Sequence, residues 1–191
     1  MSDSPTRDDA WTLLNEYTDS PSLIKHALAV EAAMRAYAEH FGEDAESWGI
    51  IGLIHDFDYQ QNPTEDTHLH VGTGILREQG WPEEWILAVA SHADYMGVPR
   101  ETLVAKTLFS VDELAGFLTA CALVRPDKAI AEVKVKSVKK KLKDKAFARE
   151  VNRQDVYSGA EALGVDLGEH IEYVRDAMAT ISEDLGLPGG S

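Results

Sequence analysis

Residues 52–59 (GLIHDFDY) constrain the fold of this chain more than any other stretch. Small and apolar residues from 50 to 54 indicate the last turns of a buried helix, and the run stops at the adjacent pair His55 and Asp56. Burying two ionisable side chains at the end of an apolar run is costly unless they have partners. Neutral histidine and ionised aspartate are both good ligands for a divalent cation. The segment therefore predicts a helix that ends at a metal site, provided that the chain supplies further ligands.

Apolar residues recur at helical spacing along most of the chain, and the alternation typical of strands is nearly absent. The pattern predicts helices over residues 8–17, 21–41, 44–55, 68–79, 82–92, 101–124, 133–151, 153–163 and 167–185. The fold class is therefore all-α. We expect a tail and short helix over residues 1–19, a core over 20–125, a helical extension of the same structural unit over 126–186, and a loose end over 187–191. A length of 191 residues fits this single unit.

The composition limits the kinds of molecule that this protein is expected to bind. The net charge of −15 argues against extended contact with nucleic acid. Residues 125–153 are the exception, with eleven Lys or Arg against four Asp or Glu, and one basic patch suits a small anionic substrate. The single cysteine, Cys121, lies in an apolar run and excludes an internal disulfide. A polar N-terminus and the lack of a run long enough to span a membrane predict a cytoplasmic protein without membrane contact.

Several ionisable side chains lie at predicted helix ends or on apolar helix faces. These candidate ligands are His26, His55, Asp56, His68, His92 and Asp112. No short motif joins them, so they would have to converge from separate helices, as ligands do in helical bundles. From the residues alone, a metal site and a set of satisfied core histidines stay equal alternatives. His40 and His170 are predicted to lie outside the site, the latter on a solvated face.

The arrangement of these residues resembles the H…HD…D signature of the HD-domain superfamily of metal-dependent phosphohydrolases. His26, His55-Asp56 and Asp112 stand at the signature positions, and residues 52–58 are similar to the family's "LLHDIG" core. Residues 68–76 (HLHVGTGIL) resemble its "HPxxGAxIL" segment, which favours His68 over His70 as a ligand. Residues 88–92 (AVASH) look like its "AIRxH" segment. Residues 122–153 resemble a subset of bacterial and archaeal HD-domain hydrolases.

The resemblance implies an HD-domain helical bundle with a site for one or two divalent metal ions. Asp56 would be shared, with His26, His55 and Asp112 completing one group and His68 and His92 the other. Asp56, His68 and His92 would carry catalysis through a metal-activated water, and the substrate would be a small phosphorylated metabolite or nucleotide. Ligands without a thiolate suit Fe, Mn, Co, Ni or Mg.

Two departures from the family pattern limit the assignment. Asp58 and Tyr59 stand where many relatives have Gly and Lys, so a lysine-assisted mechanism is in doubt, and the GYP motif of cyclic-di-GMP phosphodiesterases is absent. The same six ligands would also serve a di-iron HD-fold oxygenase. A third alternative is a non-catalytic module that binds a metal or nucleotide.

Substrate-binding candidates come from the basic segment and from the turn after His92. Lys139 and Lys143 share one predicted helix face with other lysines, and they would either steer phosphate or form a solvated surface. Arg153 is the more plausible direct phosphate contact, because guanidinium binds phosphate through two hydrogen bonds. Asp94 would line the substrate pocket or serve as a turn residue. Glu113 is predicted to pair or cap rather than bind metal.

Overall fold

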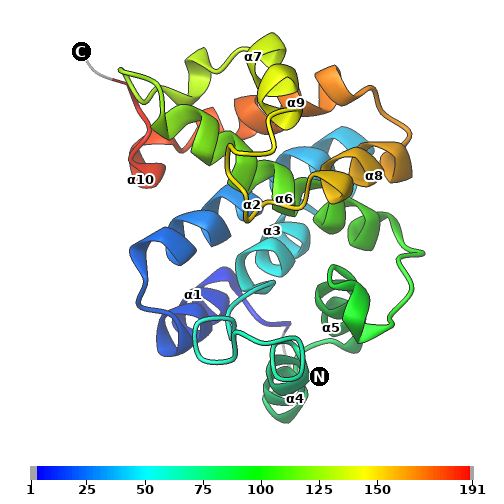
Figure 1. The fold of residues 1–191 in the computed structure, drawn as a ribbon. Helices are drawn as coiled ribbons and strands as arrows, with labels where there is room; N and C mark the ends of the chain where they lie inside the picture. The colour runs from blue at the N-terminus through cyan, green and yellow to red at the C-terminus, as the bar shows by residue number, and fades with distance from the viewer. Residues whose placement is uncertain (1–3, 190–191) are drawn as a thin grey trace.

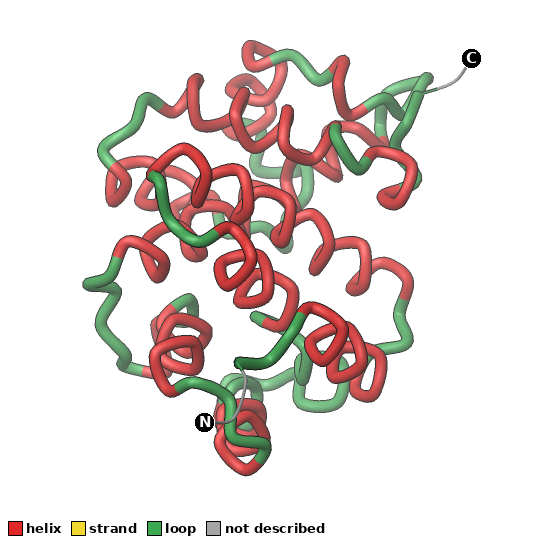
Figure 2. The backbone as a smooth tube through the Cα atoms, turned by 180° about the vertical axis from the view of Figure 1, so that it is seen from behind, coloured by secondary structure: helices red, strands yellow, loops and turns green. Residues whose placement is uncertain are grey.

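The computed structural model describes residues 4–189, and every regular element in this range is a helix (Figure 2). The α-helices are α1 (Arg7–Tyr17), α2 (Pro21–Phe41), α3 (Ala45–Ile54), α4 (His70–Glu78), α5 (Glu83–Ser91), α6 (Leu103–Leu123), α7 (Val135–Leu142), α8 (Arg153–Leu163), α9 (Leu167–Ala179) and α10 (Ser182–Leu185). Two short 3-10 turns, η1 (Asp94–Met96) and η2 (Ile130–Glu132), complete the set. The predicted all-α class is confirmed.

Two long helices, α2 and α6, run through the middle of the molecule, and α3 packs against α2 (Figure 1). Gly52 lets α3 approach closely, because a Cβ at this position would lie 2.9 Å from Met34 Cγ and 3.1 Å from the Val30 carbonyl oxygen. The capping residues explain where these helices begin and end. Asp44 accepts hydrogen bonds from the first turn of α3, and Gly42 closes α2 with a left-handed backbone.

The C-terminal helices pack on these central helices. The extension from residue 126 onward places α8 against α6 and α9 against both α2 and α6. Gly159 makes the α8–α6 contact possible, because a Cβ there would lie 2.5 Å from Ser110 Cα. In Figure 1 this extension occupies one end of the molecule, whereas α1, α4 and α5 lie at the other.

The structure differs from the sequence-based expectation in the basic segment. The helix predicted over residues 133–151 is only α7 (Val135–Leu142), and residues 144–151 form turns instead. The Arg153 guanidinium donates hydrogen bonds to the carbonyl oxygens of Asp144, Phe147, Ala148 and Val151. These bonds satisfy backbone groups that a continuing helix would have used internally.

The chain ends are also more ordered than predicted. Thr6 caps α1 and Arg7 begins it, so only residues 1–3 of the predicted tail lie outside the described range. Leu187, predicted to be loose, is 1% exposed and its carbonyl oxygen accepts a hydrogen bond from Ile130. Residues 190 and 191 lie outside the described residues. The helix predicted over 167–185 breaks after Ala179, where the Thr180 hydroxyl donates to the Ala177 carbonyl oxygen and competes with the helical bonding pattern.

Within residues 4–189, we find no helix with the length and apolar character needed to cross a bilayer.

Candidate metal centre

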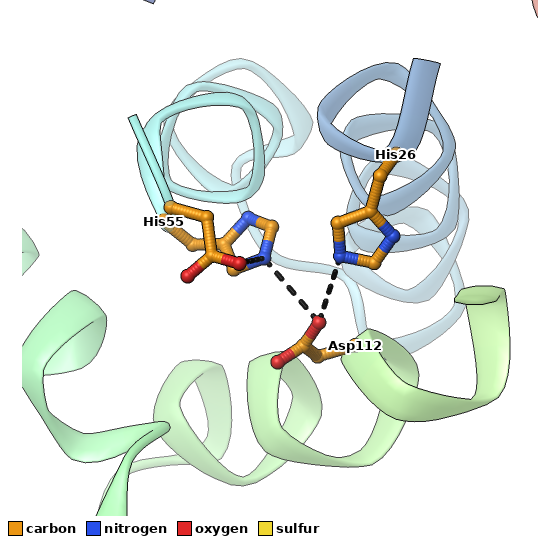
Figure 3. A group of neighbouring side chains, drawn as sticks. His26, His55 and Asp112 are labelled. Atoms are coloured by element: carbon orange, nitrogen blue, oxygen red, sulfur yellow. Dashed lines mark hydrogen bonds and ion pairs between the residues drawn. The ribbon is translucent and has the colours of Figure 1, made fainter. Parts of the chain in front are cut away.

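One cluster of ionisable side chains joins α2, α3 and α6. His26 lies on α2, Asp112 in the middle of α6, and His55 at the C-terminal cap of α3. His26 Nε2 lies 2.9 Å from Asp112 Oδ1, and His55 Nε2 lies 3.3 Å from the same oxygen (Figure 3). Asp56 follows His55 directly, with Oδ2 3.5 Å from His55 Nε2. One ligand atom from each of these four side chains lies within 4.8 Å of the others.

A second cluster shares Asp56 with the first. Asp56 Oδ1 lies 3.0 Å from His68 Nε2 and 3.2 Å from His92 Nε2. His92 caps the C-terminus of α5, and His68 lies in the turn before α4. The structure therefore brings together all six predicted ligands, in two groups that each can hold a metal ion.

The imidazoles are oriented by their second ring nitrogen. His55 Nδ1 donates to the Gly52 carbonyl oxygen at 2.8 Å, and His92 Nδ1 donates to that of Val89 at 2.6 Å. Each acceptor is a carbonyl oxygen three residues back in the last turn of a helix, where the usual partner four residues further on is missing. Both rings consequently present Nε2 to the carboxylates, as second-ring hydrogen bonds do for metal-binding histidines.

His55 provides a direct test of whether these residues fit a cation. Its Nε2 is fully buried and makes no hydrogen bond among residues 4–189, although oxygens of Asp56 and Asp112 face it. A lone pair turned toward two carboxylates in a buried site is unfavourable unless positive charge lies between them. The arrangement fits a metal ion.

The electrostatics of the cluster also favour positive charge. Burial alone would lower the pKa of His68, but hydrogen bonds to Asp56 and Asp58 outweigh it and raise the pKa to about 9. The pKa values of His55 and His92 are raised against their burial, chiefly by Asp56 and Asp112 for the first and by Asp56 for the second. Against burial, the pKa of Asp56 is lowered by His55, His68 and His92. The pKa of Asp112 is lowered by His55 and His26. The carboxylates thus stay ionised and attract cations.

A cavity of about 590 Å³ opens over the two clusters. Acidic side chains beyond the six candidate ligands line it, together with two tyrosines and Asn152. These lining residues are Tyr59, Glu65, Asp94, Tyr95, Glu113, Asn152 and Asp155. In the part of the chain that the structure describes, no lysine or arginine lines the cavity.

The predicted phosphate contacts therefore lie elsewhere. Arg153 is occupied with the carbonyl oxygens of residues 144–151, and its guanidinium stacks 5.5 Å from the Phe117 ring. The Lys139 amine lies beside Gly168 at the start of α9, and Lys143 is exposed at the end of α7. Asp94 does line the cavity, where Arg100 holds its carboxylate at 2.6 Å.

The comparison with known proteins identifies the segment that supplies the ligands. Residues 23–116 match the family model described as HD domain. These residues form an HD domain. Over 108 residues the chain is 32% identical to Ribonuclease Y of Deinococcus radiodurans, an alignment covering 56% of this chain and 17% of that relative. The chain thus spans less than a fifth of the length of that relative. No solved structure matches the chain significantly.

All six candidate ligands lie inside the HD domain. An HD domain is typical of metal-dependent hydrolases. Part of the cavity wall comes from outside it. Asn152 caps α8, and Asp155 lies in the first turn of that helix. Glu113 accepts a hydrogen bond from the Asn152 backbone at 3.0 Å, so it pairs as predicted and also lines the cavity. Burial and the neighbouring Asp112 raise the pKa of Glu113 to about 7.

Asn152 and Asp155 were not predicted from the sequence as cavity residues. The one sequence feature that marks them is the predicted start of a helix at residues 152–153.

The prediction that His170 lies on a solvated face is wrong. His170 is 1% exposed, accepts a hydrogen bond from the Tyr37 hydroxyl at 2.5 Å and donates to the Ser110 carbonyl oxygen at 2.9 Å. His40 and His70 are both exposed, and neither belongs to the ligand groups.

Proposed function

We propose that this protein is a metal-dependent phosphohydrolase that acts on a small phosphorylated metabolite or nucleotide. The observation that carries the proposal is the pair of ligand groups that share Asp56 beneath an open cavity. The HD domain supports the same reaction class. Two bound divalent ions would activate a water and neutralise the phosphoryl oxygens.

The residues of the chain have separable roles in this proposal. His26, His55, Asp56 and Asp112 would hold one ion, and Asp56, His68 and His92 the other. Asp56 belongs to both groups, with Oδ2 facing His55 and Oδ1 facing His68 and His92. Because no described lysine or arginine lines the cavity, phosphate binding would depend on the ions. The acidic groups and Asn152 would instead meet hydroxyl or amino groups of the organic part of the substrate.

The test is phosphate release by protein reconstituted with Mn²⁺, Fe²⁺ or Co²⁺, across a panel of sugar phosphates, nucleotides and p-nitrophenyl phosphate. We expect metal-dependent release that the Asp56→Asn variant abolishes. The matched control is His40→Ala, which removes an exposed imidazole on α2 outside both ligand groups and should keep full activity. Metal-loaded protein that releases phosphate from no member of the panel would contradict the proposal.

One observation favours a second candidate. A cavity lined by carboxylates and tyrosines, with no described cationic side chain, also suits a less anionic substrate, and the same ligands could support a di-iron oxygenase. Oxygen uptake by the iron-loaded protein in the presence of candidate substrates, without phosphate release, would favour this alternative.

A further inference from the structure

Asp58 stands out among the buried acidic residues, because it lies beside the candidate metal centre without belonging to either ligand group. Its side chain is 0% exposed, and both carboxylate oxygens are engaged. Oδ1 lies 3.0 Å from His68 Nδ1, and Oδ2 accepts hydrogen bonds from the backbone N–H groups of Leu69 and Gly72, each at 3.0 Å. Burying a carboxylate is costly, and the three hydrogen bonds to His68, Leu69 and Gly72 offset that cost.

The chain around Asp58 is shaped to admit this carboxylate. A Cβ at Gly72 would lie 2.7 Å from Asp58 Cγ, so only glycine permits the contact. Leu69 has a φ of +61°, a left-handed conformation that is unfavourable for leucine, and its N–H points to Asp58. The backbone at the start of α4 thus encloses the Asp58 carboxylate and donates two hydrogen bonds to it.

His68 needs such a partner because of its place in the fold. His55 and His92 each end a helix, where a backbone carbonyl oxygen three residues back accepts a hydrogen bond from Nδ1 and fixes the ring. His68 precedes α4 instead, in the turn that leads into that helix. Asp58 supplies the acceptor that a helix end would otherwise provide.

We propose that Asp58 is a positioning residue that holds the His68 ring with Nδ1 protonated and Nε2 turned toward Asp56, ready to bind the second metal ion. The inference rests on the metal centre of the proposed function. A carboxylate behind a histidine ligand also makes that histidine a stronger ligand.

The variant Asp58→Asn distinguishes the positioning of His68 from the second role of Asp58, which is to accept hydrogen bonds from N–H groups at the start of α4. The amide oxygen can still accept from Leu69 and Gly72, but the amide nitrogen is a donor and cannot accept the His68 proton. We expect near-normal thermal stability with about 10–100-fold weaker binding of the second ion, the loss typical when the hydrogen-bond partner behind a metal-binding histidine is removed. Asp58→Ala should lose both thermal stability and binding of the second ion, because alanine can accept no hydrogen bond from Leu69, Gly72 or His68. Asp66→Asn makes the same chemical change at an exposed position of the same loop and should bind as wild type.

The readout is Co²⁺ or Mn²⁺ bound per chain at graded free metal, measured by equilibrium dialysis and elemental analysis, beside His68→Ala and the double variant. The effect of Asp58→Asn should vanish when His68 is already absent. In the Zn²⁺-loaded wild type, ¹⁵N spectra should show His68 protonated at Nδ1. Unchanged binding in Asp58→Asn, or wild type that binds no ion at the His68 group, would overturn the proposal. If Asp58→Asn binds the second ion more weakly but the wild type releases no phosphate, the role of Asp58 is supported and only the proposed phosphohydrolase function is contradicted.

Discussion

At the scale of single residues, the two most buried histidines of this protein have opposite environments. His55 faces two carboxylates, which raise its pKa. His170 lies between a tyrosine hydroxyl and a backbone carbonyl, and burial lowers its pKa. A neutral His170 satisfies both partners, because one ring nitrogen accepts and the other donates. The second histidine thus belongs to the packing of α9 on α2 and α6, not to the metal centre.

The lowered pKa of His170 makes stability depend on pH. Below the ordinary histidine pKa of about 6.5, His170 binds a proton in the unfolded chain but stays neutral in the folded protein. The free energy of unfolding therefore falls as the pH falls. We expect wild type to lose more free energy of unfolding between pH 7.5 and 5.0 than His170→Gln, which cannot titrate. Urea unfolding of both proteins at matched metal content measures the difference. Parallel pH profiles would contradict this account.

At the scale of the helices, the sequence predicts the elements that build the core, because their periodicity and caps are local. Ser20-Pro21 and Gly42 mark the ends of α2, and Arg153–Leu163 is found as predicted for α8. The basic helix is different. Its predicted second half is held as turns by Arg153, a contact between residues that local patterns do not relate. The same contact removes Arg153 from the candidate site.

Helix contacts also position the ligands, and Gly52 tests this. Gly52→Ala would push α3 away from Val30 and Met34 and displace His55. We expect a loss of about 1–3 kcal/mol in the free energy of unfolding, as in other overpacked cores, together with weaker metal binding. Gly74→Ala on α4 is the control, because no atom lies within 4 Å of its Cβ position. It should be neutral or stabilising by up to about 1 kcal/mol. Equal effects of the two substitutions in urea unfolding would contradict this explanation.

At the scale of the whole molecule, the extension beyond the HD domain completes the cavity. The six candidate ligands could be picked from the sequence, because it places each one at a predicted helix end or on an apolar helix face. Their assignment to a metal site rested on the resemblance to the HD signature. The wall formed by Asn152 and Asp155 could not, since it depends on how α8 docks on α6 through Gly159 and Ser110. The charge run over residues 125–153 pointed to phosphate binding, yet Arg153 binds backbone carbonyl oxygens and the Lys139 amine lies beside α9.

The packing of α8 and α9 on α2 and α6 predicts that the chain behaves as one unit. Limited trypsin digestion that cuts near Arg125 should yield no fragment ending there with its own cooperative thermal transition. Removing α8 and α9 would expose apolar surface on both central helices and leave that fragment unfolded. Mass spectrometry and circular dichroism of the products make the measurement. A stable, helical fragment ending near Arg125 would show that the extension is a separate domain.

Asp56 belongs to both ligand groups, so two metal ions should bind to each chain. Elemental analysis of the reconstituted wild type, His68→Ala and the control His40→Ala gives the number of ions per chain. We predict two ions in wild type and in the control, and one in His68→Ala. One ion in all three proteins would reduce the centre to the group of His26, His55, Asp56 and Asp112. No bound ion after reconstitution with Mn²⁺, Fe²⁺ and Co²⁺ would show that neither group is a metal site.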